Sequence, residues 1–496
     1  MDTTLNAVTN PYELNSPGRK QCSLLAVWIG VASTIMISMT ASLMLPIAAE
    51  EFGAGTEWSM GISLGSVISI VCMPLYGYLT ARNPHIKRPL FVISFIISGT
   101  VVLLRGVAPN MWVIIVPTLV LTIYSPAIYV IGYSLVRDMY GMKKGAQYLG
   151  FVATMQGIGL LVGPVVGSMM IQNLGWRSVN FLIAPLLYLC ALLMFFGARI
   201  TKEEGQTIAT SRGKFDYPGA IAVSVMLASL IVMLSMTSFM PWGSPGNLAL
   251  IVIAILSLIW LASIVKKKGN DAFLPAPVLK DRNTRFLFLI NFCFTFSAMG
   301  MGAFLPSFLM YVMMKEPTTS GIASAFYAVA GLFMGPIYGR IMAKTGTARE
   351  TVMYSGGLLR CAVQLAMLFI VVMHHETVPI YAVYIIMFVG GFYSAVGGVT
   401  PAVAPQVQLR EEIRPLGNSI IQLGANFGSS VGIAIFSAVI ATVGLEQGFK
   451  TLLFITSFIS ILDFVFAMPL KKLPEFEAIA EAKKAEKQAK KDAKNN

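Results

Sequence analysis

Residues 247–268 read NLALIVIAILSLIWLASIVKKK, a nearly unbroken apolar run that ends in three lysines. The stretch before the lysines would rise about 29 Å as an α-helix, which matches the ~30 Å hydrocarbon core of a bilayer. Positive residues gather at the cytoplasmic ends of membrane helices. Residues 247–265 are therefore predicted to cross a membrane, with the lysines inside the cell.

The same alternation of apolar runs and basic clusters continues along the chain. Of the 496 residues 56% are hydrophobic and only 12% are charged, whereas soluble domains carry about 25% charged residues. The composition therefore predicts an all-α membrane protein. The net charge of +13 does not indicate nucleic-acid binding, because the basic residues lie in short clusters between the apolar runs.

Breaks at polar, Gly and Pro clusters divide the chain into fourteen predicted spans. They are residues 24–48, 58–80, 89–107, 111–135, 147–171, 180–199, 216–239, 247–265, 286–313, 321–343, 351–373, 379–404, 416–442 and 451–470. With the N-terminus inside, 31 of the 36 Lys and Arg residues fall on the cytoplasmic side. Both termini are therefore predicted to be cytoplasmic.

The fifth predicted span contains Gly159-Leu-Leu-Val-Gly163-Pro164-Val-Val-Gly167. Glycines four residues apart let a neighbouring helix approach closely, and a proline frees a backbone carbonyl and bends the helix. The string resembles the antiporter motif of major facilitator drug exporters. Ordinary close packing of helices is the alternative interpretation.

Two similar loops follow the second and tenth spans. The first contains Gly77, Arg82, Lys87 and Arg88, and the second contains Gly339, Lys344, Gly346 and Arg349. Both resemble the cytoplasmic gating loop of the major facilitator superfamily, and their spacing indicates two homologous halves. Each loop has alanine, Ala81 or Ala343, where the family has aspartate, which puts the family's ion-pair latch in doubt.

A further resemblance to the fourteen-helix drug:proton antiporter-like branch is found at Gly175-Trp176-Arg177 and at Phe215-Asp216-Tyr217-Pro218-Gly219. The resemblance implies a major facilitator fold of two six-helix bundles plus two extra central helices. Its expected segments are a cytoplasmic tail (1–23), an N-terminal bundle (24–199), a linker with the extra helices (200–285), a C-terminal bundle (286–470) and a basic cytoplasmic tail (471–496), which is a solvated helix or a clamp on lipid headgroups.

Ionisable residues inside a span are costly and mark candidate functional sites. Arg360 and Asp463 lie about 13 Å and 10 Å from the inner ends of their spans. We predict that they pair, which offsets the burial of each. The pair is structural in one interpretation, and Asp463 couples transport to protons in the other. Arg105, near an outer span end, is expected to reach the interface.

The resemblance implies a substrate cavity between the two bundles, near the middle of the membrane. Its candidate polar and aromatic residues are Ser38, Thr40, Tyr124, Tyr129, Gln156, Asn291, Thr295, Tyr393, Gln422 and Asn426. Asn291 and Thr295 share a helix face, as do Gln422 and Asn426. Interhelical hydrogen bonding is the alternative role for each of them. Such a cavity is nearly uncharged, which favours neutral, amphipathic or anionic solutes over polycations.

These features predict a secondary transporter of a small organic solute in a plasma membrane of bacterial type. Proton-linked export is the first expectation, and uptake or facilitated diffusion of an organic anion or bile-acid-like solute is the alternative. A non-transporting sensor is a further one. No catalytic set lies at membrane depth and no nucleotide-binding loop is present, so we expect no enzyme activity, cofactor or metal. The expected partners are the solute, protons and membrane lipid, with the chain acting as a monomer.

Overall fold

The computed structural model describes residues 10–53, 58–209, 216–235, 240, 243–269, 272–315 and 317–474. Every regular element in these residues is a helix. The principal helices are α1 (Pro17–Glu51), α2 (Trp58–Arg82), α3 (Lys87–Gly106), α4 (Trp112–Leu121), α6 (Tyr133–Gly150), α7 (Val152–Leu174), α8 (Arg177–Phe195), α10 (Tyr217–Ser235), α11 (Pro245–Lys268), α13 (Arg282–Tyr311), α14 (Pro317–Thr345), α16 (Arg360–Ala366), α17 (Ile380–Gln408), α18 (Arg414–Val443) and α19 (Leu445–Ala467). Shorter ones are η1 (Pro11–Leu14), η2 (Pro84–Ile86), α5 (Tyr124–Pro126), η3 (Ala127–Gly132), α9 (Lys202–Thr207), α12 (Ala276–Lys280), α15 (Arg349–Thr351), η5 (Val352–Leu359) and η6 (Met367–Val372).

Ten helical stretches of the described residues are long and apolar enough to cross a membrane. One of them, Trp112–Leu174, overlaps two predicted spans. The helices α2, α10 and α18 lie at three further predicted spans but are not among the ten. The all-helical membrane fold is confirmed, while the count of fourteen spans and the cytoplasmic position of the termini remain predictions.

Local sequence fixes where the helices begin and end. α11 begins at Pro245, which suits a first helical turn, and the Ser244 hydroxyl accepts a hydrogen bond from the Asn247 N–H. Gly175 and Gly444 have φ of +80° and +82° and lie at the turns after α7 and α18. A positive φ favours glycine, so the same residue type makes a similar turn in each half of the chain.

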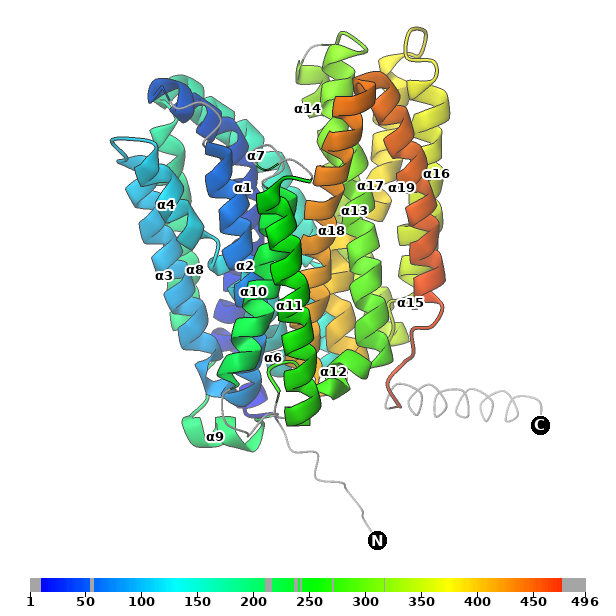
Figure 1. Ribbon diagram of the computed structural model, residues 1–496. Coiled ribbons are helices and arrows are strands. Elements are labelled where there is room, and N and C mark those ends of the chain that lie inside the picture. The colour runs from blue at the N-terminus through cyan, green and yellow to red at the C-terminus, as the bar shows by residue number, and fades with distance from the viewer. Residues whose placement is uncertain are drawn as a thin grey trace, which may run out of the picture.

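The helices group into two halves (Figure 1). In the first half α1 packs on α7 and α3 packs on α8; in the second, α13 packs on α18 and α19, and α14 packs on α17. The halves contact each other where α14 and α17 meet α6 and α7, and where α18 meets α2. A functional site shared by both halves is therefore bordered by these six helices.

The helices α10 and α11 pack on each other in front of the two halves in Figure 1, and α10 also contacts α2 and α18. α11 leaves large apolar side chains exposed, among them Leu248, Val252 and Ile259. Exposed apolar surface of this extent along one helix fits contact with lipid. The pair lies within the predicted linker (200–285), whose boundaries, like those of the other segments, stay predictions.

Candidate functional site

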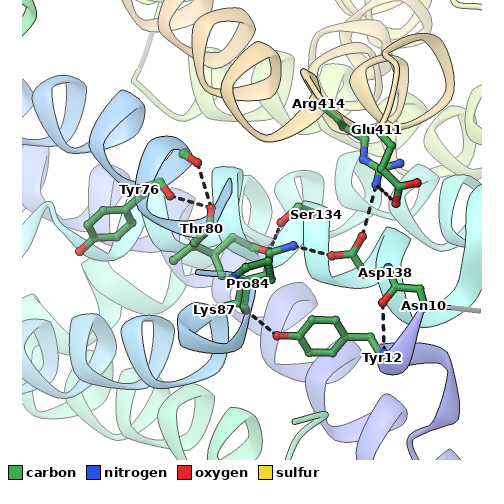
Figure 2. Close-up of polar contacts among 12 residues, drawn as sticks. Asn10, Tyr12, Tyr76, Thr80, Pro84, Lys87, Ser134, Asp138, Glu411 and Arg414 are labelled. Carbon is green, nitrogen blue, oxygen red and sulfur yellow. Dashed lines mark hydrogen bonds and ion pairs between the residues drawn. The ribbon is translucent and has the colours of Figure 1, made fainter. Parts of the chain in front are cut away.

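Charged side chains of α3, α6 and α18 meet between the two halves. Asp138 of α6 binds the Lys87 Nζ through Oδ2 at 2.5 Å, and Arg414 of α18 lies 3.5 Å from Oδ1. All three side chains are almost fully buried. Figure 2 shows the Asp138 carboxylate between the two cations. We call Lys87, Asp138 and Arg414 the Asp138 cluster.

The segment before α1 covers this cluster. Tyr12 of η1 is fully buried, and its hydroxyl donates a hydrogen bond of 2.8 Å to the Pro84 carbonyl. The Lys87 ammonium lies 5.8 Å from the centre of the Tyr12 ring, within reach of a cation–π interaction. Burial, together with the negative charge of Asp138, raises the pKa of Tyr12 well above its ordinary value. The phenol therefore stays neutral and acts as a hydrogen-bond donor.

The first predicted gating loop lies mostly in helix ends. Gly77 and Arg82 are in the last turns of α2, and Lys87 and Arg88 begin α3. A Cβ atom on Gly77 would lie 3.0 Å from the Pro415 carbonyl of α18, so this glycine lets the two halves touch. Asp138 was not among the predicted site residues, although it supplies a carboxylate where the gating loop has Ala81. The sequence signal for it was that Asp138 is the single acidic residue between the fourth and fifth predicted spans.

The second predicted gating loop is held by a neutral amide. Gly339 and Lys344 lie in α14, Gly346 forms a turn with φ of +72°, and Arg349 begins α15. At the end of α17, the Gln408 amide donates to Thr347 Oγ1 and accepts from the Ala348 N–H, both at 3.0 Å. The two halves therefore hold their gating loops in different ways. A buried ion pair holds the loop of the first half, and the Gln408 amide holds that of the second.

Further hydrogen bonds join the two halves. They run from Arg137 Nε to the Gln406 carbonyl (3.1 Å), from Asn418 Nδ2 to the Tyr129 carbonyl (2.9 Å) and from Thr154 Oγ1 to the Leu332 carbonyl (2.7 Å). Each is a single bond from a side chain to the main chain, of a kind worth about 0.5–1.5 kcal/mol net. Contacts of this size break and re-form readily.

Small residues let the halves approach at backbone distance. A Cβ atom on Gly150 of α6 would lie 2.7 Å from the Gly339 Cα of α14. No larger residue fits at that point without moving one helix away from the other. Gly339, predicted as a gating-loop residue, therefore lies at a close backbone approach between α6 and α14.

The glycines of the predicted antiporter motif face α1. A Cβ atom on Gly159, Gly163 or Gly167 would lie 2.5 Å from the Ala32 carbonyl, 3.2 Å from Met36 Cα and 2.7 Å from Thr40 Cγ2, respectively. Pro164 lies within α7, and its side chain is outside the described residues. The motif thus forms a smooth face between α7 and α1 within the first half.

The ten candidate cavity residues divide into two groups. Three reach the seam between the halves: Tyr129 through its carbonyl, Asn426 through an amide contact of 3.6 Å with Met73 Sδ, and Gln156 through its contact with Gly398. The others are Ser38, which is exposed, and six that contact their own half, namely Thr40, Tyr124, Asn291, Thr295, Tyr393 and Gln422. Their role in substrate binding stays a prediction.

Arg360 of α16 and Asp463 of α19 form an ion pair, and both are fully buried. Arg360 also donates to Ser460 Oγ at 2.8 Å and to the Phe294 carbonyl at 3.2 Å, and its guanidinium lies 4.5 Å from the centre of the Phe294 ring. Two π-helices, η5 and η6, flank α16. Asp463 Oδ1 has no hydrogen-bond partner among the described residues, so the carboxylate keeps one free acceptor.

Arg105 does not reach the interface, so the expectation for it is wrong. It is 3% exposed, and its guanidinium lies 3.9 Å from Met44 Sδ. Arg105 Nε has no hydrogen-bond partner among the described residues. Packing by α1 keeps the side chain inside the first half, so Arg105 is a buried cation with one unused hydrogen-bond donor.

Comparison with known proteins supports the architecture. The family model described as Major Facilitator Superfamily matches residues 27–286 and 287–494. The crystal structure of the human organic anion transporter MFSD10 (TETRAN) has a TM-score of 0.59 and 13% identity, and the match covers 91% of this chain and all of that one. At this identity the likeness shows the fold.

Curated relatives are similar at low identity. Multidrug resistance protein 3 of Bacillus subtilis is 23% identical over 85% of this chain and 80% of its own length. The MFS-type transporter gkaD of Penicillium citrinum is 23% identical over 69% of this chain, and Citrate exporter 1 of Yarrowia lipolytica is 24% identical over 64%. The matches span only 59% and 46% of the lengths of these two fungal proteins.

Proposed function

The chain belongs to the Major Facilitator Superfamily and is a multi-pass membrane transporter, and from this premise we propose that it exports a small amphipathic solute in exchange for protons. In this proposal the chain lies in the plasma membrane and works by alternating access, in which the two halves open a central site to one side at a time. The observation that carries the proposal is the seam between the halves at the Asp138 cluster.

The seam supports alternating access because its contacts are reversible. Arg414 contributes one contact across the seam at 3.5 Å, and Asp138 keeps Lys87 as a partner in its own half. Three further bonds across the seam are single hydrogen bonds to main-chain carbonyls, and the Asn426 amide makes a weak contact with Met73 Sδ at 3.6 Å. With the predicted orientation, these contacts lie on the cytoplasmic side, so we infer that the arrangement is closed to the cytoplasm.

Export is favoured by the motif on α7 and by the relatives. Gly159, Gly163 and Gly167 form the smooth face against α1 that the antiporter motif requires. Curated relatives carry the names Multidrug resistance protein 3 and Citrate exporter 1. For proton coupling the candidate is Asp463, a buried carboxylate inside a span with one free acceptor atom.

Transport of an organic anion is the second candidate, and Arg105 favours it. This buried cation has an unused donor and, among the described residues, no carboxylate within ion-pair distance (4.0 Å). An anionic solute could supply the missing partner. The structural neighbour named as an organic anion transporter fits the same candidate.

Transport in proteoliposomes tests both candidates. The purified chain is reconstituted and assayed by counterflow and by pH jump with drugs, bile-acid-like amphiphiles and organic anions. Exchange predicts that an imposed proton gradient drives the solute in the direction opposite to the protons. Accumulation of a solute together with protons would instead show uptake by symport, and binding without movement would indicate a sensor.

A further inference from the structure

A basic pocket lies at the predicted cytoplasmic end of the second half, apart from the Asp138 cluster. It has a volume of about 1090 Å³ and is bordered by the start of α13, the turn after α14, the end of α17 and the segment after α19. We propose that this pocket binds a phosphate-bearing anion at the membrane surface, with the headgroup of an anionic phospholipid as its ligand.

The charge of the pocket favours an anion. Two acidic side chains line it, Asp281 and Glu350. Five cationic side chains line it as well: Arg282, Arg349, Arg410, Lys471 and Lys472. Asp281 already accepts hydrogen bonds from the Thr284 N–H (2.8 Å) and hydroxyl (2.9 Å). None of the five cations has a carboxylate of the described residues within 4.0 Å. Guanidinium groups bind phosphate through paired N–H donors, so three arginines around one cavity match this chemistry.

Hydrogen bonds tie the floor of the pocket together. The Asn283 amide donates to the Gln408 carbonyl (2.9 Å) and to the Lys471 carbonyl (3.0 Å), and Asn283 Oδ1 accepts from the Lys471 N–H (3.0 Å). The Gln408 amide donates to the same Lys471 carbonyl at 3.1 Å. These bonds fix the segment after α19 to the ends of α13 and α17. The main chain at Lys471 is therefore held in place before a ligand arrives, which lowers the entropic cost of binding.

The rim of the pocket points to a lipid as the source of the phosphate. Met353 and Tyr354 belong to η5, in the first turns of the membrane-spanning stretch Arg349–Val372, and they line the same pocket. Tyr354 is 61% exposed, and aromatic side chains of this kind favour the headgroup region of a bilayer. An anionic lipid could thus place its headgroup among the cations and its chains beside the helix.

Binding of short-chain lipids tests the proposal on the full-length protein in detergent. Dioctanoyl phosphatidylglycerol is titrated against dioctanoyl phosphatidylcholine and pyrophosphate, and binding is followed by native mass spectrometry. We expect the anionic phosphatidylglycerol to bind at least tenfold more tightly than the zwitterionic phosphatidylcholine. If pyrophosphate displaces phosphatidylglycerol with an equal affinity, the natural ligand is a soluble phosphate and the lipid is excluded. If pyrophosphate does not displace it, the ligand is the lipid.

Matched variants show whether the pocket or the overall charge binds the lipid. Arg349→Gln/Arg410→Gln removes two exposed cations of the pocket, and Lys266→Gln/Lys267→Gln removes two exposed cations at the end of α11. The pocket variant should lose at least tenfold in affinity and the control less than twofold; Arg282→Gln is an independent second variant. Equal losses in both double variants, or equal binding of the two lipids, would overturn the proposal.

Discussion

Asp138 of α6 lies 2.5 Å from the Lys87 ammonium of α3, and this short contact stays inside the first half of the protein. The contact of Asp138 with Arg414 across the seam is longer, at 3.5 Å, and Arg414 also lies 3.3 Å from Glu411 in its own half. Each partner thus keeps an opposite charge when the halves separate. The free energy of opening is therefore kept small, although the groups are buried.

Asp138→Asn and Arg414→Gln should have unequal effects. Loss of the carboxylate leaves Lys87 buried without a counter-charge, which costs about 3–5 kcal/mol, while loss of Arg414 leaves the Lys87–Asp138 pair intact. Thermal unfolding of the two purified variants measures the difference. We expect a large drop in Tm for Asp138→Asn and a small one for Arg414→Gln. Equal drops would show that the contact across the seam carries the stability of the cluster.

Gly150→Ala should weaken closure of the seam. Its new methyl group would lie 2.7 Å from Gly339 Cα, so α6 and α14 must move apart at a cost of about 1–3 kcal/mol. Gly302→Ala is the control, because this exposed helical glycine has nothing within 4 Å of its Cβ position. Distances between spin labels on α6 and α14 report the closure. Unchanged label distances in Gly150→Ala would contradict the tight approach.

The sequence predicted the ion pair inside the spans better than the contacts between distant helix ends. Arg360 and Asp463 stand out because charge is rare at membrane depth, and the structure places them in contact. Lys87 and Arg414 approach Asp138 from 51 and 276 residues away, and no local pattern reports which helices meet. Arg105 was mispredicted because the direction of a long side chain depends on its packing, here against Met44 of α1.

Asp216→Asn should loosen the anchor of α10 and α11 in a pH-dependent way. Burial raises the pKa of Asp216, but hydrogen bonds from Lys268 (2.7 Å), the Phe273 N–H (2.8 Å) and the Gly219 N–H (3.0 Å) outweigh it and lower the pKa overall. A lowered pKa in the folded state adds stability above the unfolded value of about 3.9, and this stability is lost as the pH falls below it.

We therefore expect wild type and Asp216→Asn to differ by about 1–3 kcal/mol in free energy of unfolding at pH 7. The difference should shrink as the pH falls below about 4, where the Asp216 carboxylate of the unfolded chain begins to bind its proton while that of the folded protein is still charged. Chemical unfolding of both proteins at several pH values measures it. Lys267→Gln, an exposed change beside Lys268, serves as the control and should show no such trend. A difference that stays constant with pH would exclude the charge of Asp216 as its cause.

Removing the Arg360–Asp463 pair as a unit separates its structural role from proton coupling. Asp463→Asn alone leaves Arg360 buried and unpaired, which costs about 3–5 kcal/mol, whereas Arg360→Met/Asp463→Leu replaces both charges by apolar groups and should restore most of the stability. We expect the double variant to exchange solute in counterflow but to ignore a pH jump, because the titratable group is gone. A double variant that follows the pH jump as the wild type does would remove Asp463 from the coupling mechanism and leave the pair a structural role alone.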